Sequence, residues 1–260
     1  MLILNYISFF FLIILTFLSI SGYGAVFSNH KNINIFEKLF LGFIFLAFFN
    51  TLFHFFFKLN FYINLLIFLL GIIFFKINKL NIDKKKLFYF LIIIFLIPIF
   101  ITQKYHEDFG YYHLPYALSF LEEKIIFGLA NSNIAYTYNS IWLNVYPTFF
   151  TETKNYDFLT LPTFILFICF ILLLTHNFLN SKDWRLSNLF SIVLIFYYLL
   201  KFTRISEFGV DLPSSLYSNL AIFYFIKFFE TQDLDNKKNY FFLNTNFAVF
   251  SILIKLSAFP

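Results

Sequence analysis

Long apolar runs alternate along this chain with short polar segments, and that alternation predicts its architecture. Eight runs approach the roughly 20 residues that an α-helix needs to cross about 30 Å of hydrocarbon. They are Leu4–Val26, Ile35–Phe57, Phe61–Ile77, Leu87–Ile101, Phe158–Leu179, Leu186–Phe202, Leu212–Phe229 and Phe241–Leu256. Because these runs are too long and continuous for barrel strands, we predict an all-α, polytopic transmembrane bundle of about eight spans.

One long polar stretch divides the chain into three parts. Four predicted transmembrane helices occupy residues 1–101, a large loop occupies residues 102–157, and about four further helices occupy residues 158–260. The loop is the longest part of the chain that is too polar to cross a membrane. It is therefore the first place to look for chemistry in water.

Within the loop, apolar residues recur at helical spacing. Leu114, Leu118, Leu121 and Ile125 are four, three and four residues apart, which places them on one face of a helix. This stripe predicts an amphipathic helix that lies at the outer membrane interface. Gly128 is expected to end that helix.

The composition excludes several classes of protein. The chain is 60% hydrophobic and 13% charged, whereas a soluble domain has roughly a quarter of its residues charged. Its single cysteine, Cys169, rules out an intrachain disulfide. No lysine or arginine precedes the first apolar run, which favours an uncleaved first helix over a signal peptide. No nucleic-acid motif occurs, so the expected partner is a lipid bilayer and not a nucleic acid.

The distribution of lysine and arginine predicts the orientation. If the large loop is outside, the outer connections hold seven of the 19 lysines and arginines, and the other twelve lie inside. The outer seven are Lys58, Lys104, Lys124, Lys154, Lys201, Arg204 and Lys255. The basic run from Lys76 to Lys86 is short and close to two membrane ends, where the positive-inside rule acts most strongly. We therefore expect a bacterial inner (plasma) membrane protein whose large loop is periplasmic or extracellular.

The start of the loop carries the densest group of chemically active side chains. His106, Glu107 and Asp108 are consecutive, and His113 follows seven residues after His106, which would place both histidines on one helical face. Such a set is able to bind a divalent metal, with His106, Asp108 and His113 as the ligands. The alternative is that the histidines are interfacial polar groups or substrate contacts and that the acids belong to a solvated loop. Both interpretations stay open.

Several short motifs from Asp108 onward resemble those of GT-C membrane glycosyltransferases, including the protein mannosyltransferase and aminoarabinose transferase branches. The similarity is closest to an uncharacterised bacterial branch and spans roughly Tyr105 to Pro260. The segments that carry it are Asp108–Pro115, Gly128–Asn131, Asn139–Trp142, Glu207–Pro213 and Lys255–Ser257. The chain departs from the family pattern because three helices precede the one that leads to the acid. It also stops where such enzymes continue for several spans, so we expect a truncated C-terminus.

The resemblance implies an inverting transfer of a sugar from a polyprenyl-phosphate donor to an envelope glycan, lipid or protein on the outer face. A carboxylate is able to act as the base that activates the acceptor hydroxyl, and Asp108 is the first candidate, with Glu107 second. Arg204 and Lys255 are expected to bind the leaving phosphate. The complete set of expected substrate contacts is Tyr111, Tyr112, His113, Trp142, Arg204, Glu207, Asp211 and Lys255.

Two other interpretations fit the same residues. In both, the protein is a non-catalytic multispan membrane protein. It is a transporter or flippase for lipid-linked saccharide in the first and a truncated remnant in the second. Asp211 stands before Leu212 and Pro213 and also fits a helix N-cap. Transport favours charged or broken helices in mid-membrane, whereas the ionisable residues here cluster at helix ends.

Overall fold

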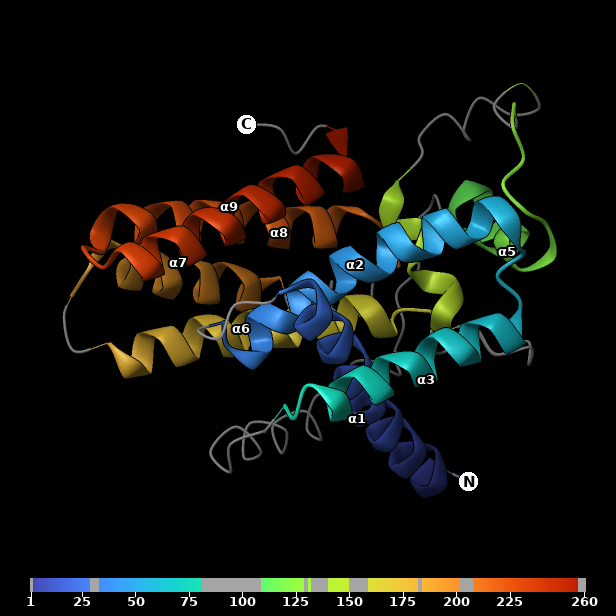
Figure 1. The fold of residues 1–260 in the computed structure, drawn as a ribbon, viewed down its shortest axis with the longest axis horizontal. Helices are drawn as coiled ribbons and strands as arrows, with labels where there is room; N and C mark the ends of the chain where they lie inside the picture. The colour runs from blue at the N-terminus through green and yellow to red at the C-terminus, as the bar shows by residue number, and fades with distance from the viewer. Residues whose placement is uncertain are drawn as a thin grey trace.

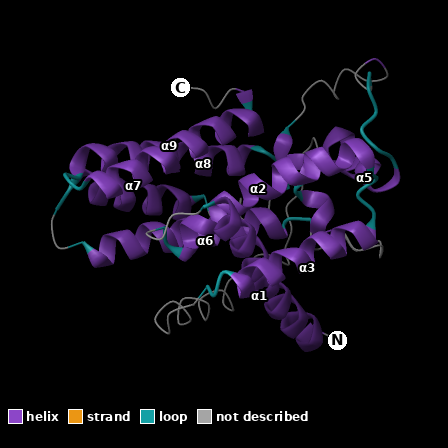
Figure 2. Ribbon diagram, viewed as in Figure 1, coloured by secondary structure: helices purple, strands orange, loops and turns teal. Residues whose placement is uncertain are grey.

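The residues that the structure describes fold mainly into α-helices (Figure 1). A computed structural model describes residues 2–28, 33–80, 109–128, 131, 140–149, 159–181, 184–201 and 208–256, with the backbone only at residues 2–7, 112 and 113. Across these ranges the regular elements are helices, and none is a β-strand (Figure 2). The predicted all-α class is confirmed.

Most of the described helices coincide with predicted apolar runs, and the last of them begins earlier than its run. The α-helices are α1 (Leu2–Phe27), α2 (Ile35–Phe56), α3 (Phe61–Ile77), α5 (Leu114–Glu122), α6 (Leu161–Asn180), α7 (Leu186–Leu200), α8 (Asp211–Glu230) and α9 (Leu234–Ile254). A π-helical turn, η1 (Phe109–His113), precedes α5, and two 3-10 turns, η4 (Ile141–Asn144) and η5 (Tyr146–Phe149), precede α6.

Three helices are long and apolar enough to cross a membrane: Ser8–Phe27 within α1, Ile35–Phe56 and Leu161–Asn180. The helices α3 and α7 are apolar but shorter. The predicted span Leu87–Ile101 lies outside the described residues. A membrane-embedded helical protein is thus supported, while the number of eight spans stays a prediction.

Side-chain caps explain where several helices begin. Asn34 Oδ1 accepts the backbone N–H of Glu37 at 3.0 Å, and Glu37 Oε2 accepts the N–H of Asn34 at 2.7 Å. This reciprocal capping box satisfies donors that the first turn of α2 leaves without helical partners. Asp233 caps α9 with a single bond of this kind, accepting the N–H of Asn236 at 3.1 Å. As a result α9 begins at Leu234, well before the apolar run that predicted it.

Close backbone approach joins α1 to α2 and α3. A Cβ added to Gly24 would lie 1.6 Å from the carbonyl oxygen of Lys38, and one added to Gly42 would lie 1.9 Å from that of Ile20. Gly22 meets the backbone of α3 in the same manner. Small residues at such contacts let membrane helices approach until their backbones touch. The three N-terminal helices therefore form one tightly packed unit.

The C-terminal helices form a second unit that packs against α2. The antiparallel helices α8 and α9 are joined by Ser214 Oγ, which donates to the carbonyl of Ser251 at 3.2 Å. Tyr217 of α8 is fully buried and donates to the carbonyl of Phe40 in α2 at 2.8 Å. Hydroxyl donors of this kind strengthen helix packing where water is absent.

The amphipathic loop helix is present, but it packs differently from the prediction. Ala117 and Phe120 are its buried residues, and the Phe120 ring lies 4.6 Å from the ring of His54 at the end of α2. The predicted leucine stripe is only half-buried. The helix ends at Glu122, so the expectation that Gly128 terminates it was wrong. Gly128 instead adopts a left-handed conformation (φ +78°) in the turn that follows.

Candidate functional site

Segments far apart in sequence meet at one end of the bundle, which we call the loop end. It contains the C-terminus of α2, the helix α5, the turns η4 and η5, and the start of α8 (Figure 1). Asn50 of α2 holds η4 and η5 in place, because its Nδ2 donates to the carbonyl of Asn144 at 2.7 Å and to Thr148 Oγ1 at 2.8 Å. The candidate residues of the sequence are attached to this scaffold.

Three aromatic rings hold the two acid-bearing loop segments together. Phe208 stacks on Tyr146 with ring centroids 4.2 Å apart, and it meets Phe109 edge-on at 5.1 Å. Tyr146 fixes the arrangement because its hydroxyl donates to the carbonyl of Gly209 at 2.7 Å. Phe109 and Phe208 are the residues that directly follow the candidate acids Asp108 and Glu207 in the chain.

The structure brings together two candidate residues that are 44 positions apart. Lys255 Nζ lies 2.6 Å from Asp211 Oδ1, where the end of α9 meets the start of α8. Their side chains are 43% and 60% exposed, so the pair contributes at most about 1 kcal/mol to stability. Asp211 is the first residue of α8 and not its N-cap, which is Val210, so the N-cap interpretation was wrong. We call Phe109, Tyr146, Phe208, Asp211 and Lys255 the loop-end cluster.

The predicted aromatic contacts divide into accessible and buried residues. Tyr111 is 70% exposed in η1, and the backbone of Tyr112 and His113 belongs to the same turn. Trp142 is fully buried, with its ring 5.3 Å from that of Phe43. An indole buried in the core cannot stack on a sugar or lipid, which corrects the expectation for Trp142. Burial also raises the pKa of Tyr116 in α5.

Several predicted residues fall outside the described part of the chain. These are His106, Glu107, Asp108, Arg204 and Glu207. The metal hypothesis depends on two of them. Among the residues that the structure does describe, no group of three or more histidine, cysteine, aspartate or glutamate side chains is arranged to hold a metal ion.

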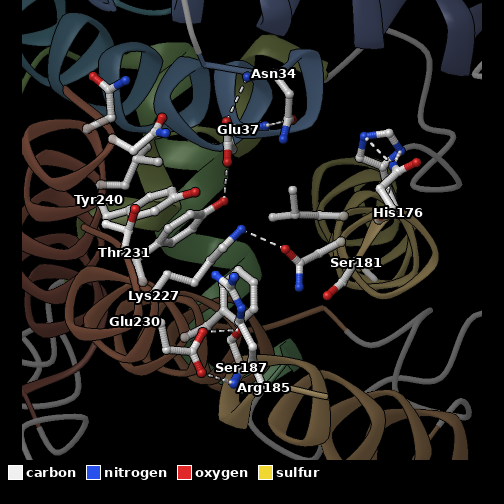
Figure 3. Close-up of a pocket in the computed structure, with 18 of the residues that line it drawn as sticks. Asn34, Glu37, His176, Ser181, Arg185, Ser187, Lys227, Glu230, Thr231 and Tyr240 are labelled. Atoms are coloured by element: carbon white, nitrogen blue, oxygen red, sulfur yellow. Dashed lines mark hydrogen bonds between the residues drawn. The ribbon is translucent and has the colours of Figure 1, made fainter. Parts of the chain in front are cut away.

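A polar cavity of about 350 Å³ lies at the opposite end of the bundle from the loop end. Figure 3 shows its side chains converging from different helices, with Glu37 from α2, His176 from α6, Lys227 and Glu230 from α8, and Tyr240 from α9. The rest of the lining includes several asparagines, namely Asn34, Asn177, Asn180, Asn188, Asn236 and Asn239.

Both carboxylates of the cavity cap helices. Glu37 Oε1 accepts the hydroxyl of Tyr224 at 2.5 Å, while Oε2 accepts the backbone N–H of Asn34. Glu230 accepts the backbone N–H of Ser187 at 2.8 Å and the Ser187 hydroxyl at 2.5 Å. The N-cap of α7, Arg185, makes no side-chain cap bond, so Glu230 of α8 supplies that acceptor from a neighbouring helix.

The basic side chains of the cavity have different surroundings. Lys227 Nζ donates to Asn177 Oδ1 at 2.6 Å and lies 5.0 Å from the ring centroid of Tyr240. Arg185 is exposed at the rim. From the sequence alone, Lys227 and Arg185 are two of the twelve cations expected inside, and no site is predicted around them. The sequence signal for this site is that polar residues occur at the C-terminal ends of α6 and α8 and at the N-terminal ends of α2, α7 and α9.

The chain belongs to a family described as "Domain of unknown function (DUF8201)", whose profile matches residues 2–260. No curated protein matches the chain significantly. No solved structure matches it significantly either.

Proposed function

We propose that this membrane protein is a GT-C-like glycosyltransferase that moves a sugar from a polyprenyl-phosphate donor to an acceptor at the loop end. The observation that carries the proposal is the contact between Phe109 and Phe208, whose ring centroids are 5.1 Å apart. Since each ring directly follows a candidate acid, the contact supports a single site built from the large loop and the segment that precedes α8. The resemblance to GT-C enzymes supplies the reaction class.

In this proposal Asp108 removes the proton from the acceptor hydroxyl, with Glu107 as the second candidate for that role. Lys255 and Arg204 stabilise negative charge on the departing polyprenyl phosphate. Asp211 holds the Lys255 ammonium through their 2.6 Å contact, so the cation stays at the mouth of the site. Glu207, Tyr111, Tyr112 and His113 complete the sugar and lipid contacts.

The loop end faces the cell exterior or periplasm in this proposal. The described lysines and arginines are more numerous at helix ends away from the loop end, as the positive-inside rule requires of the inner side. The ones away from it are Lys38, Lys76, Lys79, Arg185, Lys227, Lys237 and Lys238, and the ones at the loop end are Lys58, Lys124, Lys201 and Lys255.

Labelling with an impermeant maleimide tests the orientation. The only native cysteine, Cys169, is buried, so it contributes little background. Phe127 at the loop end is 82% exposed and Trp184 at the opposite end is 77% exposed. Intact cells should label Phe127→Cys and should leave Trp184→Cys unlabelled until they are lysed. The reverse pattern would contradict the orientation.

Charge-removing variants test the catalytic proposal in cells. Asp108→Asn should lower transfer by about a hundredfold or more, the usual contribution of a general base. Lys255→Gln should lower it by about tenfold while leaving protein level unchanged, because an exposed ion pair adds little stability. Lys201→Gln, an exposed lysine at the same end, serves as the matched control. A normal envelope glycan profile in Asp108→Asn would remove Asp108 from the mechanism.

The transporter interpretation has less support. In the described helices, carboxylate, amine and guanidinium groups lie in the first or last turns, and the interhelical bonds farther in come from neutral groups such as those of Tyr23, Ser19 and Tyr217. Charged groups in mid-membrane typically mark a transport pathway. Their position at helix ends therefore favours chemistry at a surface.

A further inference from the structure

We propose that the polar cavity binds a phosphate group, carried either by a soluble phosphate ester or by a lipid headgroup, with the Lys227 ammonium as its principal contact. This site lies at the opposite end of the bundle from the loop-end cluster. It does not depend on glycosyl transfer, and a failure of one proposal leaves the other standing.

The surroundings of Lys227 favour an anion. Its side chain is half-buried, and its ammonium group lies in the cavity beside one amide oxygen, Asn177 Oδ1, at 2.6 Å. The rings of Phe223 and Tyr240 flank it, with centroids 5.3 and 5.0 Å away. The Glu37 and Glu230 carboxylates line the same cavity and act on Lys227 electrostatically. A half-buried ammonium still gains from a further anion that contacts it directly.

The two cavity carboxylates are already engaged in structural bonds. Each oxygen of Glu37 accepts a hydrogen bond, from Tyr224 and from the backbone of Asn34. Each oxygen of Glu230 accepts one from Ser187. Bonds that cap helices hold these carboxylates against the cavity wall. Lys227 and Arg185 are the cations of the cavity lining (Figure 3).

The remaining lining suits the polar part of a phosphate-bearing molecule. Arg185 at the rim carries a guanidinium, whose donors fit phosphate oxygens. Asn236, Asn239 and Thr231 supply neutral amide and hydroxyl groups. A volume of about 350 Å³ falls within the range of small-molecule sites, so a phosphate and a small organic group fit together.

The cavity lies at the end of a candidate membrane span, which makes a lipid headgroup one of the two sources of the bound phosphate group. The candidate span Leu161–Asn180 ends at the cavity, and its last residue lines it. Trp184 and Leu186, on either side of Arg185, are 77% and 62% exposed. An exposed tryptophan beside a cation at the end of a span is typical of the headgroup level of a bilayer.

Binding measurements on the full-length chain test the proposal and separate the sources. Inorganic phosphate and glycerol 3-phosphate are titrated calorimetrically into detergent-solubilised protein. In parallel, native mass spectrometry compares retention of phosphatidylglycerol and phosphatidylcholine after release from mixed nanodiscs. Binding of inorganic phosphate or glycerol 3-phosphate identifies a site for soluble phosphate compounds, whereas selective retention of phosphatidylglycerol identifies a headgroup site.

Variants decide whether Lys227 is responsible. Lys227→Met should raise the dissociation constant at least tenfold for whichever source binds. Lys237→Met is the matched control, because Lys237 also lies over a ring, that of Phe228 at 5.8 Å, but outside the cavity lining. If Lys227→Met does not fold, Arg185→Gln, which changes an exposed side chain, should weaken binding severalfold. Absence of binding to both sources, or binding that neither cavity variant weakens, would overturn the proposal.

Discussion

Removing one buried hydroxyl should show how strongly the cavity wall holds the two halves of the bundle together. Tyr224 of α8 is fully buried, and its hydroxyl donates to Glu37 Oε1 of α2 at 2.5 Å. Tyr224→Phe removes the donor and leaves a buried carboxylate oxygen without it. A hydrogen bond to a charged group contributes about 1.5–3 kcal/mol, so that is the expected loss.

Tyr217→Phe provides the matched comparison on the same helix. Tyr217 is also fully buried, but its hydroxyl donates at 2.8 Å to the neutral backbone carbonyl of Phe40. That carbonyl lies inside α2 and keeps its helical partner, so the expected loss is about 0.5–1.5 kcal/mol. Thermal unfolding of both variants in one detergent should therefore give Tyr224→Phe roughly twice the decrease in midpoint. Equal decreases, or no decrease in Tyr224→Phe, would refute the assignment of a strong bond to Glu37.

Two further stability predictions follow from close packing. Gly42→Ala should prevent normal packing of α1 against α2, because the added Cβ would lie 1.9 Å from a backbone carbonyl oxygen. Gly110→Ala should leave packing unchanged, because nothing lies within 4 Å of the added Cβ. In size-exclusion chromatography, Gly110→Ala should elute as a monodisperse peak and Gly42→Ala should not. Phe208→Ala should cost about 3–5 kcal/mol by opening a cavity beside Tyr146, while Phe229→Ala, 65% exposed, should cost far less in thermal unfolding. Equal behaviour within either pair would contradict the packing described here.

The apolar runs predicted most helices because a membrane-length run has few other ways to satisfy its backbone. They misplaced the start of α9, which carries Asp235, Lys237 and Lys238 in its first turns. The signal there was the cap at Asp233 and not hydrophobicity. A cap shows where a helix begins, whereas an apolar run shows only which part of the helix is apolar. A helix extends beyond its apolar run when a cap satisfies the backbone N–H groups of its first turn.

Glycine contacts and the polar cavity could not be predicted from the chain alone. Gly24 and Gly42 lie inside apolar runs, where only the neighbouring helix shows that a methyl group does not fit. In the sequence, each charged residue of the cavity looks like an ordinary helix-end residue. Glu37, Lys227 and Glu230 come together only through tertiary packing.

The loop end was anticipated in part. Asp211 and Lys255 were both candidates, and the antiparallel pairing of α8 and α9 brings them into contact. Trp142 was misjudged because an aromatic residue near a predicted interface is as easily buried as exposed. It lies in a 3-10 turn that directs it into the core beside Phe43.

The cellular level of the donor that the proposed enzyme consumes tests glycosyl transfer most directly. Membrane lipids are extracted from cells that lack the protein and from cells that carry wild type, Asp108→Asn or Lys201→Gln, and polyprenyl-monophosphate sugars are quantified by mass spectrometry. We predict that such a lipid accumulates without the protein, falls to normal with wild type and Lys201→Gln, and stays high with Asp108→Asn at equal protein level. Identical lipid profiles in all four strains would contradict glycosyl transfer from a polyprenyl-phosphate donor.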